Sequence, residues 1–91
     1  MTPDKALQRL KDGSQRFKEN KTLPKKESFS SFAAILTCID CRLTLEAIFD
    51  QDFGSIIVTR VAGGVLSEDV IAGLEYATEI IGVKLITIVG H

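Results

Sequence analysis

Three runs of hydrophobic residues divide the chain, and segments with helical periodicity separate them. The runs cover residues 32–38, 55–59 and 84–89 and are rich in aliphatic and β-branched side chains. Short apolar runs of this kind predict strands covered on both faces. Between them, residues 44–52 and 67–81 place hydrophobic side chains at helical spacing, with Gly82 as the expected stop of the second helix.

The first thirty residues predict a helix followed by a loop. Thr2, Pro3 and Asp4 supply a hydroxyl cap, a proline for the first helical position and an acid for the first turn. Gly13 lies in the middle of this helix and predicts a weak point at which the helix bends. Residues 20–30 are polar, contain a proline and predict a connecting loop.

The order of elements predicts an α/β fold with a parallel sheet. Strands that alternate with helices are joined by right-handed crossovers. We expect one domain over residues 1–91, made of an N-terminal helical arm and loop (1–30) and a βαβαβ core (31–91). The expected strand order is 2-1-3. No helix follows the third strand, so we expect the sheet to be part of a larger fold.

Composition and charge narrow the classes of protein. Hydrophobic residues make up 45% and charged residues 25% of the 91 residues, which argues against disorder. No stretch is long enough for a transmembrane helix and no secretory signal is visible, so we expect a cytoplasmic protein that binds no membrane. Residues 1–27 carry net charge +4 and residues 28–91 carry −5. The basic segment has no base-stacking pattern, and we expect it to contact an acidic body, its own or a partner's, rather than nucleic acid.

Residues that could carry chemistry follow each predicted strand. The segments concerned are 38–42, 60–64 and 90–91. Ligands of open parallel sheets bind beyond the carboxyl ends of the strands. If the first strand lies in the centre, Cys38 and His91 follow neighbouring strands, and a thiolate with an imidazole suits zinc.

Each of these residues also has a purely structural interpretation. Cys38 can act as a small hydrophobic residue at the end of a buried strand. Asp40 and Arg42 can form an ordinary surface ion pair. Gly63 and Gly64 can serve only as a turn.

Taken together, the motifs resemble those of the β-class carbonic anhydrases. The resemblance is carried by Cys38-x-Asp40-x-Arg42, Arg60-Val61-Ala62-Gly63, Leu74-Glu75-Tyr76-Ala77 and Gly90-His91. Residues 2–10 and 48–51 also match forms common in bacterial members. The similarity extends over essentially the whole chain.

The resemblance implies a Zn²⁺ site and the reversible hydration of CO₂ to bicarbonate. Cys38 and His91 would be metal ligands, with the family's second cysteine expected three residues after the histidine, beyond residue 91. Without that cysteine, we expect zinc binding and activity of the 91 residues to be impaired. Asp40 would orient the attacking hydroxide, and Arg42 would keep Asp40 ionised. Gly63 and Gly64 would let the backbone approach the substrate crevice.

The same resemblance implies a homodimer or larger homo-oligomer formed through the N-terminal helix. Two positions depart from the family pattern, because Cys41 replaces the usual serine and Gly64 stands where asparagine is common. Two other functions stay open, a non-catalytic carbonic-anhydrase-like domain and a thiol–disulfide oxidoreductase that uses Cys38 and Cys41. Carbon–sulfur compounds also stay open as substrates in place of CO₂.

Overall fold

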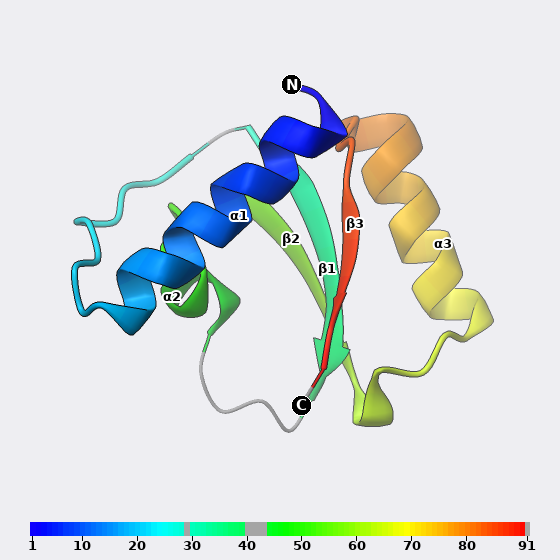
Figure 1. Ribbon diagram of the computed structural model, residues 1–91. Coiled ribbons are helices and arrows are strands. Elements are labelled where there is room, and N and C mark those ends of the chain that lie inside the picture. Colours follow the sequence, from blue (N-terminus) through cyan, green and yellow to red (C-terminus); the bar gives the residue numbers. More distant parts are fainter. Residues whose placement is uncertain (29, 40–43, 91) are drawn as a thin grey trace.

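The computed structural model describes residues 1–28, 30–39 and 44–90 and contains a three-stranded parallel sheet in the order β2-β1-β3 (Figure 1). The strands are β1 (Ala33–Cys38), β2 (Ile56–Val61) and β3 (Ile86–Val89). The helical elements are α1 (Pro3–Lys18), α2 (Leu45–Ile48), the 3₁₀ turn η1 (Ala62–Gly64), α3 (Glu68–Tyr76) and the π-helical turn η2 (Ala77–Ile81). The predicted fold class and the strand order 2-1-3 are confirmed.

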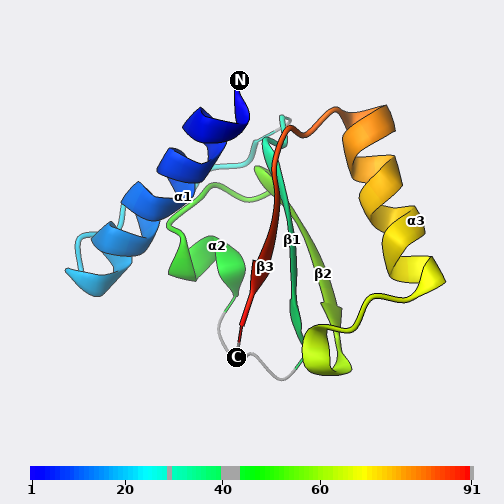
Figure 2. The ribbon, with the colours of Figure 1, turned by 45° about the vertical axis from the view of Figure 1, so that its right-hand side comes forward.

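Helices cover both faces of the sheet. In Figure 2, α1 and α2 lie on one side of the strands and α3 lies on the other. The chain moves from β1 to β2 in one direction and from β2 across β1 to β3 in the other. Two right-handed crossovers that run in opposite directions must place their helices on opposite faces, as observed.

The central strand β1 joins two hydrophobic clusters. Between α1 and the sheet, Ala6 and Leu10 pack against Ala33 and Ile35. On the other face, Ala34 packs with two buried side chains from the end of the helical crossover and the segment that follows it, which are Ala77 and Val83. Alternate residues of β1 therefore enter opposite clusters, which explains its uninterrupted hydrophobic sequence.

Strand β3 differs from its prediction as a strand buried on both faces. Ile86 and Ile88 are exposed, and Ile88 is 66% exposed. Ile86 pairs with Ala34, so both lie on the face that α3 covers. The cluster beneath α3 reaches Ile57 of β2 but includes no residue of β3, so this face of β3 stays uncovered.

Helix α1 begins as predicted and runs without interruption through Gly13. The Thr2 hydroxyl accepts a hydrogen bond from the Lys5 N–H at 3.2 Å and caps the helix. A Cβ added at Gly13 would lie 1.6 Å from the carbonyl oxygen of Phe49. The glycine therefore lets α1 touch the backbone at the end of α2, and the helix continues through it.

Two helices end differently from the prediction for residues 44–52 and 67–81. Helix α2 ends at Ile48, because Asp50 adopts a left-handed backbone conformation with φ of 47°. The second crossover helix becomes a π-helical turn, and Ile81, expected in the apolar stripe, is exposed. Gly82 stops it with φ of 88°, as predicted. In the part of the chain described, no helix is long and apolar enough to span a membrane.

Candidate metal centre

The carboxyl ends of the three strands meet at one edge of the sheet. Cys38 pairs with Val61 at the end of β2, and Thr37 pairs with Val89 at the end of β3. Gly90 follows Val89 directly. The parallel register therefore brings together the strand ends from which the sequence predicted the site residues.

Cross-strand hydrogen bonds flank Cys38 on both sides. The Thr37 hydroxyl donates to the Val89 carbonyl at 3.1 Å, and the Ile39 N–H donates to the Val61 carbonyl at 3.1 Å. Thr37 is 1% exposed. These bonds fasten the end of β1 to both neighbouring strands, so the backbone at Cys38 is held on either side.

The glycine turn after β2 lies against this edge. Gly63 and Gly64 have φ of 71° and 62°, a region that side chains disfavour. A Cβ on Gly64 would lie 3.8 Å from the Thr37 carbonyl carbon and 3.9 Å from the Cys38 nitrogen. The structure therefore places Gly64 beside Cys38. The turn formed by Gly63 and Gly64 contacts the candidate site and does not lie apart from it on the surface.

Cys38 has the donor chemistry that zinc requires. It is a free, partly exposed cysteine at the end of the central strand. Thiolate sulfur is a preferred ligand of zinc. Within residues 1–28, 30–39 and 44–90, no group of three histidine, cysteine or acidic side chains could hold a metal ion. The predicted site residues Asp40, Arg42 and His91, and also Cys41, lie outside the described residues.

Sequence reasoning missed a second cluster of charges, which surrounds Asp50. Its carboxylate accepts hydrogen bonds from Arg16 Nε at 2.5 Å and from Lys25 Nζ at 2.7 Å. The Leu23 N–H adds bonds at 3.1 and 3.2 Å. The only feature of the sequence that pointed to this cluster was the net charge of +4 on residues 1–27. The basic segment does contact an acidic group of its own chain, Asp50.

These bonds keep Asp50 charged although its side chain is only 1% exposed. Burial acts to raise the pKa of Asp50. The hydrogen bonds from Lys25, Arg16 and the Leu23 N–H outweigh burial and lower the pKa from 3.8 to about 2. The cluster ties α1 and the connecting loop to the turn after α2.

Comparison with known proteins identifies the family. A sequence model described as carbonic anhydrase matches residues 33–91. Carbonic anhydrase 2 from two strains of Mycobacterium tuberculosis is 33% identical over 99 residues, which cover 98% of this chain and 48% of the relative. A carbonic anhydrase of Mycolicibacterium smegmatis is 32% identical over 99 residues, which again cover 98% of this chain and 48% of the relative. The chain spans about half the length of these relatives, and it belongs to the β-class carbonic anhydrase family.

Proposed function

We propose that this chain takes part in the zinc-dependent, reversible hydration of CO₂ to bicarbonate and a proton. The observation that carries the proposal is the free thiol of Cys38 at the carboxyl end of the central strand, with Gly64 packed beside it. This is the edge at which open parallel sheets bind their ligands. Family membership supports the reaction class.

Cys38 and His91 would hold the metal. Bound zinc would supply a Lewis acid that lowers the pKa of a water molecule toward neutrality. Asp40 would accept a hydrogen bond from the attacking oxygen and direct a lone pair of that oxygen at the CO₂ carbon. Arg42 would keep Asp40 ionised through a charge-assisted pair.

The backbone around Cys38 supports this role. Two metal-binding side chains from different strands can share one ion only if the backbone of each is held in place. Cross-strand hydrogen bonds on both sides of Cys38 hold its backbone. Gly63 and Gly64 would leave room for a small apolar substrate such as CO₂. No side chain projects from either residue into the crevice.

The homo-oligomer expected through the N-terminal helix is part of the same proposal. In the structure, α1 buries Ala6 and Leu10 against its own sheet. Leu7 and Phe17 stay 37% exposed on the same helix and are available to a second copy. Sedimentation of the wild type and of Leu7→Gln would test this contact, and an unchanged oligomer would contradict it.

Zinc content and CO₂ hydration, measured on matched cysteine variants, test the function. Cys38→Ser should lose zinc and activity, whereas Cys41→Ser should keep both. Asp40→Asn should keep zinc and lose rate. Zinc retained by Cys38→Ser would contradict the proposal. Full zinc without CO₂ hydration in the wild type would favour the non-catalytic alternative.

A further inference from the structure

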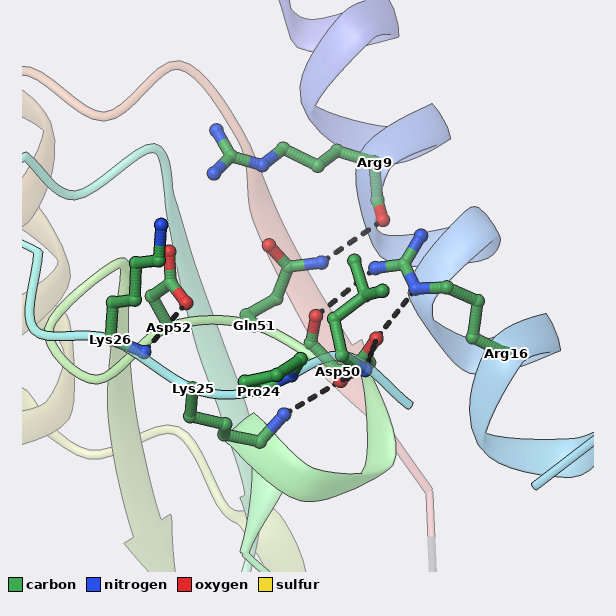
Figure 3. Close-up of a pocket in the computed structure, with 9 residues that line it drawn as sticks. Arg9, Arg16, Pro24, Lys25, Lys26, Asp50, Gln51 and Asp52 are labelled. Carbon is green, nitrogen blue, oxygen red and sulfur yellow. Dashed lines mark hydrogen bonds and ion pairs between the residues drawn. The ribbon is translucent and has the colours of Figure 1, made fainter. Parts of the chain in front are cut away.

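A hollow of about 570 Å³ lies between α1, the connecting loop and the turn after α2, away from the carboxyl edge of the sheet (Figure 3). Its size falls within the range of small-molecule sites. Helix α1 contributes Arg9 and Arg16, and the loop contributes Lys25 and Lys26. Cys38 does not line this hollow, so it is separate from the candidate metal centre.

The lining carries an excess of positive charge. Four cationic side chains face two carboxylates, those of Asp50 and Asp52, which leaves a net charge of +2. Asp50 is already bonded to Arg16 and Lys25. Arg16, Lys25 and Asp50 therefore bond to one another, and we do not expect them to be the main binding groups for a ligand.

Arg9 and Lys26 are the two cationic side chains of the lining outside the cluster around Asp50, and together with Asp52 they carry one of the two excess positive charges. Among the described residues, neither the Arg9 guanidinium nor the Lys26 ammonium has a hydrogen bond or an ion pair with a carboxylate. The Asp52 carboxylate instead accepts from the backbone N–H of Lys26 at 3.0 Å. In Figure 3 the charged ends of Arg9 and Lys26 extend toward the same side of the hollow.

Arg9 is also held in place without using its hydrogen-bond donors. Its guanidinium carbon lies 4.4 Å from the centre of the Phe32 ring, a cation–π contact. Its backbone carbonyl accepts a hydrogen bond from Gln51 Nε2 at 3.2 Å, which fixes the helix above the turn. A guanidinium stacked on a ring keeps its planar row of N–H groups available for two oxygens of one anion.

We propose that this hollow binds a phosphate-class oxyanion through Arg9 and Lys26. Arg9 would donate two parallel hydrogen bonds to the anion, and Lys26 would supply a second positive charge. Leu23 and Pro24 form an apolar wall, against which the organic part of a phosphate monoester can pack. The inference does not depend on the metal centre or on the proposed reaction.

Titration with inorganic phosphate and with glycerol 3-phosphate tests the site, at fixed pH and with ionic strength held constant by sodium chloride. Calorimetry or phosphorus NMR on the folded chain would give the dissociation constants. Arg9→Gln and Lys26→Gln should each weaken binding about tenfold, the loss of one strong charged contact. Lys11→Gln is the matched control, because Lys11 lies on α1 but does not line this hollow.

A conservative variant separates charge from geometry. Arg9→Lys keeps the positive charge but loses the planar pair of donors, so its binding should fall between the wild type and Arg9→Gln. Lys26 is exposed, so Lys26→Gln gives a test that does not disturb the core. Circular dichroism would verify that each variant is folded.

Each outcome decides the proposal. Saturable binding that is about tenfold weaker in each Gln variant and unchanged in Lys11→Gln supports it. Tighter binding of glycerol 3-phosphate would identify a phosphorylated organic molecule as the ligand, and equal binding would identify free phosphate. No saturable binding to the wild type, or equal weakening by Lys11→Gln, would overturn it.

Discussion

Replacing Asp50 by asparagine should destabilise the protein in a pH-dependent way. The pKa of Asp50 lies near 2 rather than at 3.8. Each pKa unit corresponds to about 1.4 kcal/mol, so the depressed pKa represents roughly 2 kcal/mol of folding free energy at neutral pH. Asparagine has nearly the same shape but lacks the charge that Arg16 and Lys25 neutralise.

The sign of the pH dependence follows from the direction of the shift. A carboxylate with a depressed pKa stabilises the fold fully above its unfolded pKa of 3.8. The stabilisation is lost as the pH falls through the folded value near 2. The difference in stability between wild type and Asp50→Asn should therefore be about 2 kcal/mol at pH 7 and shrink below pH 4.

Urea unfolding followed by circular dichroism, from pH 7 down to pH 2.5, measures this difference. Asp12→Asn is the matched control, because Asp12 is exposed on α1 and accepts a hydrogen bond only from Gln8 among the described residues. The control should change stability by less than about 0.5 kcal/mol. An Asp50→Asn difference that is absent at pH 7, or that stays constant below pH 4, would refute the reasoning.

Substitutions at three other positions test the packing of the helices and the pairing of β1 with β3. Gly13→Ala should lower the free energy of unfolding by at least ~2 kcal/mol, because the new methyl group meets the backbone oxygen of Phe49. A thermal melt as stable as the wild type would contradict that contact. Gly73→Ala, where a Cβ meets nothing within 4 Å, should instead raise stability by up to about 1 kcal/mol through helix propensity. A Gly73→Ala variant less stable than the wild type would contradict the open space around Gly73. Thr37→Val should speed amide exchange near Val89, because it removes the hydroxyl bond between β1 and β3, while Thr37→Ser should restore protection. Equal rates of amide exchange in Thr37→Val and Thr37→Ser would show that the hydroxyl bond does not protect this part of β3.

The parts of the fold predicted correctly depend on local patterns. The cap at Thr2 and the stop at Gly82 are set by residues within one helical turn. The hydrophobic run of β1 predicted a strand covered on both faces, and the structure confirms it. Such features need no knowledge of distant contacts.

The errors arose where distant segments decide the local conformation. Helix α2 stops early at Ile48, just before Asp50, whose carboxylate is bound by groups 34 and 25 residues away. The sequence showed Gly13 only as a weak point of its helix, and the contact of Gly13 with the Phe49 backbone was not predicted. Strand β3 looked buried because its residues are apolar, and only the position of α3 shows that one face is uncovered.

The candidate site was predicted only in part, for a similar reason. Strand ends can be located from sequence, and the register confirms that Cys38 and Gly64 lie at one edge. The hydroxyl bond from Thr37 to Val89 could not be predicted, because it depends on the register between two strands and joins residues 52 positions apart. The roles of Asp40, Arg42 and His91 stay predictions.

Cobalt substitution tests the central claim most directly, because a thiolate bound to Co²⁺ gives a charge-transfer absorption band in the near ultraviolet. If Cys38 is the metal ligand, the wild type and Cys41→Ser will both show this band when titrated with Co²⁺, and Cys38→Ser will not. A band of full intensity in Cys38→Ser would contradict the assignment of Cys38 as the ligand.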